Sequence, residues 1–175
     1  MKEICYPFDE KTVRGLTAGK MVSVSGRLFT GRDRFHKYLA DGGECPVDLK
    51  DGAVFHCGPV MLRDPDGTWR VVAAGPTTSI REEPYMAGVI EKYGVRLIIG
   101  KGGMGPRTLE ACRKYGCAYL QAVGGAAVVT ARRIKAVKGV YLAKLFGPTE
   151  AVWEFEAEKL ELIVGMDASG GTLYE

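Results

Sequence analysis

Residues 69–81 read WRVVAAGPTTSIR, and they place a polar turn directly after an apolar strand. Residues 69–74 are mostly β-branched or small, which favours a strand. Gly75-Pro76 ends that strand because proline fixes φ and lacks an N–H donor. Residues 82–93 then repeat apolar side chains at helical spacing. The stretch therefore predicts a strand, a turn and a helix, as in an α/β fold.

The turn itself carries side chains that suit a binding site. Thr77, Thr78 and Ser79 can cap the following helix, and the same geometry would direct free backbone N–H groups at an anion. Arg81 adds a planar fork that suits a carboxylate. On this segment alone, an ordinary helix cap beside a surface arginine remains the simpler interpretation, because such caps are common.

The rest of the chain alternates strand and helix patterns in the same way. Residues 21–25 alternate apolar and polar side chains until Gly26, and Asp66-Gly67 predicts a hairpin turn. No repeat or linker interrupts the pattern, so residues 1–175 are predicted to form one α/β domain with mixed strand pairing. The predicted strands span residues 21–25, 53–56, 60–62, 69–74, 95–99, 117–123, 140–145, 152–157 and 162–166, and the predicted helices span residues 34–40, 82–93, 107–115 and 124–133.

Composition excludes several classes of protein. The 175 residues, 46% of them hydrophobic, suffice to bury about 70% of the unfolded surface. A net charge of +3 without a run of Lys or Arg argues against nucleic acid but tolerates an anionic substrate. Residues 1–7 lack a signal-peptide pattern, and the run at residues 117–131 falls short of the ~18 residues of a membrane span. A cytoplasmic protein without a membrane segment is expected.

The cysteines are predicted to be reduced thiols. They contain no C-x-x-C pair, so we expect neither a disulfide framework nor a metal or iron–sulfur site within this chain. His56 and Cys57 are neighbours on a strand, where adjacent side chains face opposite sides, so a catalytic pair is not expected and a structural histidine is. The cysteines are Cys5, Cys45, Cys57, Cys112 and Cys117.

Residues 100–105 read GKGGMG and match the G-x-G-x-x-G pattern of dinucleotide sites. The strand after it ends in Gly124-Gly125, where such a site needs an acidic residue for the ribose. A P-loop is also excluded, because residues 105–107 read GPR instead of G-K-[ST]. Nucleotide binding is therefore not expected. Lys101 instead lies just past the end of a strand, where open α/β sheets bind their ligands.

Three cations each follow a predicted strand: Arg32, Arg81 and Lys101. Arg32 lies at a predicted helix start, where the helix dipole disfavours a cation, which favours a nearby anion. If the three loops converge, these side chains form a clamp for a small dianion.

Residues 12–164 resemble the β subunit, or C-terminal region, of class I iron–sulfur-dependent fumarate hydratases and the related L-tartrate dehydratase β subunit. Several motifs in the family's order are more specific than any one of them alone. The motifs are Ser25-Gly26, Thr30-Gly31-Arg32-Asp33, His56-Cys57-Gly58-Pro59, Gly75-Pro76-Thr77-Thr78 with Arg81, Gly100-Lys101-Gly102, and Gly124-Gly125-Ala126-Ala127.

The resemblance implies a swivelling β/β/α domain whose active site is shared with an α subunit that carries a four-iron four-sulfur cluster. Arg32, Arg81 and Lys101 match the family's substrate-carboxylate ligands, and Thr77 matches its proposed proton-transfer residue. A hetero-oligomer follows, with a homodimer as the alternative for the isolated chain. The turn reads TTSIR where fumarases often read TTAGR, so fumarate and tartrate both remain open as substrates. A stand-alone dicarboxylate-binding module is a third reading.

Overall fold

Five strands of the computed structural model close into a small barrel. The larger sheet has the order β1-β2-β3-β6-β7-β9-β8, and a further pairing of β2 with β9 closes the ring. Strands β2, β3, β6 and β7 run parallel, whereas β9 is antiparallel to its neighbours, so the predicted mixed pairing is confirmed. The strands are β1 (Lys2–Cys5), β2 (Met21–Thr30), β3 (Ala53–Phe55), β4 (Val60–Arg63), β5 (Trp69–Ala73), β6 (Leu97–Gly100), β7 (Ala118–Gln121), β8 (Ile134–Tyr141) and β9 (Val152–Met166).

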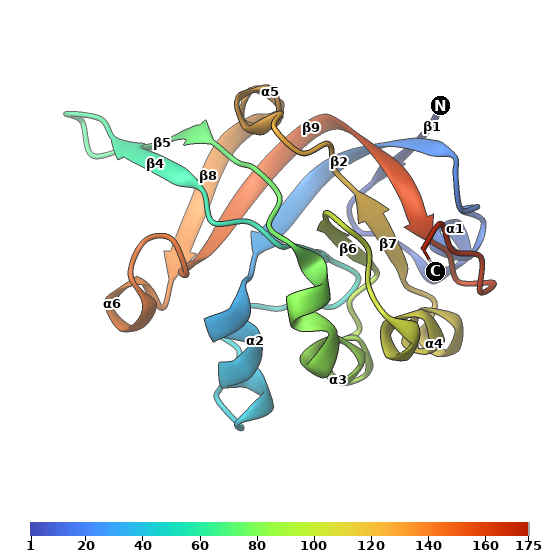
Figure 1. Cartoon of the computed structure of the whole chain (residues 1–175). Helices are drawn as coiled ribbons and strands as arrows, with labels where there is room; N and C mark the ends of the chain where they lie inside the picture. Colours follow the sequence, from blue (N-terminus) through green and yellow to red (C-terminus); the bar gives the residue numbers. More distant parts are fainter. Residues whose placement is uncertain (175) are drawn as a thin grey trace.

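The structure describes residues 1–174, and its helices cover the barrel unevenly. Helices α2, α3 and α4 lie side by side below the strands, and α5 lies on the opposite side next to β5 (Figure 1). The helices are α1 (Glu10–Arg14), α2 (Asp33–Ala40), the 3-10 helix η1 (Ser79–Glu82), α3 (Glu83–Tyr93), α4 (Pro106–Tyr115), α5 (Ala127–Arg133) and α6 (Ala143–Phe146).

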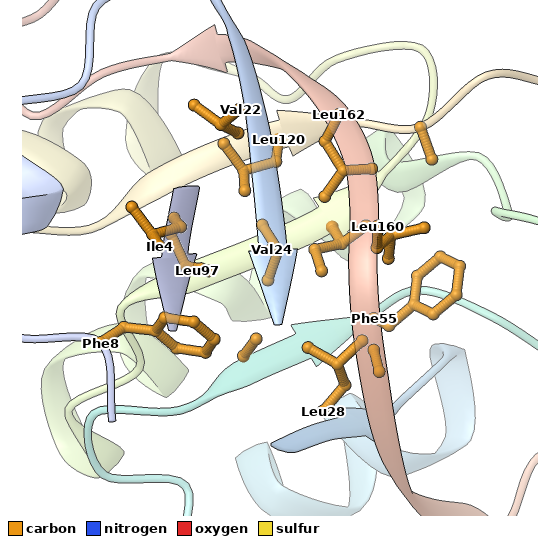
Figure 2. Packing of buried hydrophobic residues seen from close by; sticks show 14 of the residues in the cluster. Ile4, Phe8, Val22, Val24, Leu28, Phe55, Leu97, Leu120, Leu160 and Leu162 are labelled. Atoms are coloured by element: carbon orange, nitrogen blue, oxygen red, sulfur yellow. The ribbon is translucent and has the colours of Figure 1, made fainter. Parts of the chain in front are cut away.

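Alternation along the strands produces two hydrophobic cores. In β3, Phe55 belongs to the core inside the barrel, together with Val24 of β2 and Leu120 of β7 (Figure 2). Val54 belongs to the second core, which lies between the barrel wall and helices α2, α3 and α4. Strands buried on both faces read as near-continuous apolar runs, as residues 97–99 do. Burial of both faces fixes the strand register, because a one-residue slip would exchange the two sets of side chains.

Some element boundaries differ from the predicted ones. Strand β2 does not end at Gly26 but passes through a register shift there, where Gly26 adopts a φ of 105°. The strands predicted at residues 152–157 and 162–166 are one strand, β9. The strand predicted at residues 140–145 is wrong in its second half, because β8 ends at Tyr141 and Ala143–Phe146 is helical.

The hairpin predicted at Asp66-Gly67 is confirmed. Strands β4 and β5 pair antiparallel across it and form a separate two-stranded sheet that extends from the barrel (Figure 1). In residues 1–174, none of the helices has the length and apolar character needed to cross a bilayer.

Candidate active site

The four residues predicted to form the site lie at one edge of the barrel, Arg81 in the 3-10 helix η1 and the other three in loops. Arg32 follows β2 by two residues, and Lys101 directly follows β6. Strands β2, β3 and β6 are parallel neighbours, so their carboxyl ends share this edge. Thr77 and Arg81 belong to the segment between β5 and α3, which crosses the same edge.

Backbone contacts fasten that segment to the strand ends. Thr77 N donates to His56 O at 2.7 Å, and Ser79 N donates to Lys101 O at 3.0 Å. Pro76 and Thr78 form isolated bridges with Cys57 and Lys101, respectively. The segment therefore lies between the loops after β3 and β6, and it brings Thr77 and Arg81 to the edge where Lys101 lies.

The predicted capping role of the three hydroxyl residues is wrong. Helix α3 begins at Glu83, its N-cap is Glu82, and the 3-10 helix η1 lies between it and the turn. The N–H groups of Thr77 and Ser79 bond to carbonyl oxygens of neighbouring loops and so do not face an anion. The turn serves to attach loops to one another, and Arg81 remains as its group that would hold an anion.

Both arginines contact carboxylates of this chain. Arg81 forms an ion pair with Asp33, with side chains that are 62% and 34% exposed. Arg32 Nε lies 3.4 Å from Glu150 Oε1, and this pair is largely buried. The Gly58 backbone passes close to Arg32, because a methyl group at Gly58 would lie 2.5 Å from Arg32 Nη1. The carboxylates orient the two guanidinium groups, and Lys101 is half-buried at the same edge of the barrel.

A buried pair of polar side chains, His36 and Glu82, lies next to the Arg32 backbone and was not predicted from the sequence. His36 Nδ1 lies 2.9 Å from Arg32 O, and the carbonyl can only accept, so Nδ1 carries a proton. The same nitrogen lies 3.2 Å from Glu82 Oε2, and both side chains are buried. One indication of this group was present in the sequence: His36 and Glu82 are polar, yet each occupies a core-facing position of a short helix.

The pKa values of two carboxyl groups near His36, those of Glu82 and Asp33, shift in opposite directions. Burial, together with neighbouring Asp33, raises the pKa of Glu82 above its ordinary value, although His36 opposes the shift. Hydrogen bonding to Glu82, followed by the charges of Arg81 and Arg32, lowers the pKa of Asp33 against the effect of burial. The two shifts run in opposite directions, so Glu82 keeps a proton to higher pH than Asp33 does.

The second buried histidine, His56, is structural as predicted, and it contacts the site segment. His56 Nδ1 lies 2.9 Å from Ser79 Oγ, which also accepts from Lys101 N and from Tyr119 Oη, each at 3.2 Å. Its ring packs edge-on against His36, with centroids 5.2 Å apart. Cys57 points instead into the barrel core, so the two neighbouring side chains diverge.

The glycine-rich loop at residues 100–105 does not present a phosphate site. Glu83 of α3 places its carboxylate at the start of α4, where it accepts from the N–H groups of Gly105, Arg107 and Thr108 at 2.8, 3.0 and 3.1 Å. The Thr108 hydroxyl also donates to it at 2.6 Å. The chain's own carboxylate thus occupies the position that a phosphate takes in a nucleotide site.

The cysteines do not fit an iron–sulfur cluster. Across residues 1–174, no three His, Cys, Asp or Glu side chains are grouped so that they could hold one metal ion. Cys57 lies in the barrel core, and Cys112 and Cys117 lie in the other core. Burial raises the pKa of Cys57 to about 12, and burial with neighbouring Cys112 raises that of Cys117. Cluster ligands must be thiolates, and these buried thiols are protonated.

Comparison with known proteins places the chain in a family. Residues 4–175 match the family described as Fumarase C-terminus. The chain belongs to the fumarase C-terminus family. This membership agrees with the resemblance found from the motifs around Arg32, Thr77, Arg81 and Lys101.

Relatives within the fumarase C-terminus family carry two kinds of name. A putative fumarate hydratase class I from Geobacillus stearothermophilus is 48% identical over 169 residues, which cover 97% of this chain and 32% of that protein. A putative L(+)-tartrate dehydratase subunit beta from Methanocaldococcus jannaschii is 37% identical, covering 97% of this chain and 91% of that protein. The L(+)-tartrate dehydratase subunit beta of Escherichia coli K12 is 34% identical, covering 98% and 86%. The chain thus spans about a third of the Geobacillus relative.

Proposed function

We propose that this chain is the β subunit of a two-subunit iron–sulfur hydro-lyase that interconverts fumarate and L-malate by reversible hydration. The observation that carries the proposal is the placement of Arg32, Arg81 and Lys101 at one edge of the barrel, on loops bonded to one another. The names of the relatives support the reaction class, and two of them are named as β subunits. L-tartrate dehydration is the alternative reaction.

The cations serve a dicarboxylate substrate in two ways. A guanidinium offers two parallel N–H groups to a carboxylate, whereas the Lys101 ammonium is a point charge that several geometries satisfy. During dehydration the carbon next to one carboxylate loses a proton, and during hydration it gains one; in both directions that carboxylate takes up negative charge. Cations fixed beforehand by Asp33 and Glu150 would stabilise the developing charge without reorganising.

Thr77 is the proposed proton-transfer residue. Its backbone is held by His56 O, and its side chain is half-buried at the site edge. An alcohol is a poor base unless a neighbouring group takes its proton. We propose that a carboxylate of the partner chain supplies this help, so that Thr77 passes a proton between the substrate carbon and that carboxylate.

The proposed enzyme also needs a second subunit, which carries the iron–sulfur cluster. The cysteines of residues 1–174 do not fit the four-iron four-sulfur cluster, so we assign the cluster to an α subunit, where it would act as the Lewis acid for the substrate hydroxyl. The proposed assembly is an αβ hetero-oligomer, with a homodimer as the alternative for this chain alone. A cytoplasmic location remains a prediction.

A substrate panel with the co-purified assembly tests the proposal. The chain is expressed with a tag, purified anaerobically with its bound partner, and assayed with fumarate, L-malate and L-tartrate. Turnover of fumarate and L-malate is expected, and turnover of L-tartrate alone would favour the alternative. Tight dicarboxylate binding by the isolated chain, with no hydro-lyase activity in any assembly, would identify a stand-alone binding module instead.

A further inference from the structure

We propose that the buried Ser79–His56 pair is a positioning device that holds the loops of the proposed site in register. The Ser79 hydroxyl contacts three groups: His56 Nδ1 at 2.9 Å, Lys101 N at 3.2 Å and Tyr119 Oη at 3.2 Å. Ser79 and His56 are both fully buried. Neither residue touches the solvent-facing edge where a substrate would bind, so the role is positioning rather than catalysis.

Counting donors limits the direction of each bond. A serine hydroxyl has one proton to donate and two lone pairs to accept with. The Lys101 N–H can only donate to Ser79 Oγ, so the single Ser79 proton goes to His56 Nδ1 or to Tyr119 Oη. In either arrangement the three contacts of Ser79 Oγ form with a neutral His56.

The surroundings of His56 keep its ring neutral. Burial, and secondarily the neighbouring His36, holds the pKa of His56 well below its ordinary value. The other titratable groups nearby are Glu82, whose Oε2 lies 3.2 Å from His36 Nδ1, and Tyr119, which reaches His56 through Ser79. Tyr119 in turn accepts from Gly103 N at 3.3 Å, so the network extends into the glycine-rich loop.

The position of Ser79 explains why this contact matters to the site. Ser79 lies two residues after Thr77 and two before Arg81, and its hydroxyl bonds the backbone of Lys101. One oxygen thus joins the two segments that carry three of the four proposed site residues. The chain makes room for it at Gly100, where any Cβ would overlap Ser79 Oγ.

The geometry can be tested on the full chain without any assay of activity. Two-bond ¹H–¹⁵N correlation spectra should show a neutral His56, with a proton on one ring nitrogen only, unchanged between pH 5 and pH 8. Ser79→Ala should remove the bond to Nδ1 and speed amide exchange at Lys101 by about tenfold or more. A doubly protonated His56 ring in this pH range, or unchanged protection at Lys101, would overturn the proposal. Ser23→Ala, which removes another buried serine hydroxyl, is the matched control.

The effect on function rests on the proposed hydro-lyase activity. In the assembly with its partner, Ser79→Ala should lower kcat/KM by about 10- to 100-fold, because small displacements of positioned groups are costly. Ser23→Ala should stay within about twofold. Tyr119→Phe removes only the tyrosine hydroxyl and leaves the contact between Ser79 and His56. Its kcat/KM should therefore lie between the values for Ser79→Ala and Ser23→Ala. This variant also tests the proposal if Ser79→Ala folds poorly.

The two measurements separate the two hypotheses. Loss of Lys101 protection with full activity in Ser79→Ala would show that the contact exists but does not position the site, which contradicts the proposal. An assembly that is inactive with wild-type chain would contradict the proposed function, whereas the spectra and exchange rates would still decide whether Ser79 holds the loops together.

Discussion

Replacing Arg81 with lysine keeps the positive charge at the site and removes the planar fork. If Arg81 binds a substrate carboxylate through two N–H groups, lysine loses one charged hydrogen bond and the fixed geometry of the other. That loss corresponds to about 2 kcal/mol of transition-state stabilisation, or roughly a 30-fold lower kcat/KM in the assembled enzyme. Steady-state kinetics with fumarate and with L-malate measure it directly.

Stability should hardly change in the same variant. The ion pair of Arg81 with Asp33 is exposed, so it contributes at most about 0.5 kcal/mol to unfolding after solvent screening. Arg70→Lys is the matched control, because Arg70 pairs with Asp64 on the distant β4–β5 hairpin with nearly the same exposure, 58% and 35% against 62% and 34%. A kcat/KM for Arg81→Lys within twofold of that of Arg70→Lys would refute the carboxylate-binding role.

Three further variants test other parts of the site. Thr77→Val keeps the shape and removes the oxygen, so kcat should fall by about 10² to 10⁴ with little change in KM; full activity would exclude a role in proton transfer. Burial raises the pKa of Glu82, so its contribution to stability is present below pH 4.5 and lost as pH rises through the raised value. Glu82→Gln cannot ionise, so its free energy of unfolding in urea should rise relative to wild type between pH 4 and pH 8, and a constant difference would contradict the assignment. Gly100→Ala should destabilise the chain by about 1 to 3 kcal/mol because the new methyl group overlaps Ser79 Oγ. Adding Ser79→Ala should recover part of that loss, and simple additivity of the two changes would argue against the contact.

The strand and helix pattern was predictable because apolar periodicity decides it. Residues 53–56 and 95–99 read as strands and form β3 and β6, and the hairpin at Asp66-Gly67 is present. Closure of the barrel was not predictable, because it depends on β9 pairing with β2 more than 120 residues away in sequence. The helix at Ala143–Phe146 was missed because its short apolar run fits a strand equally well.

The sequence indicated the cations of the proposed site but not the residues that hold its loops together. Arg32 and Lys101 stand out because they follow β2 and β6, whose carboxyl ends lie at one edge of a parallel sheet. Arg81 follows β5 of the separate antiparallel sheet and reaches this edge through the backbone contacts of its segment. The roles of Ser79 and Glu83 were hidden because both depend on contacts between distant segments. A serine beside a predicted helix start favours a cap, yet Ser79 Oγ bonds His56 and Lys101 instead.

The division of the site between two chains is tested most directly by reconstituting this chain alone. Purified without a partner and treated anaerobically with iron and sulfide, it should remain colourless and inactive toward fumarate, L-malate and L-tartrate, because its buried cysteines do not converge. Activity should appear when a cluster-bearing α subunit is added. Stoichiometric cluster uptake by this chain, or turnover without a partner, would contradict the account.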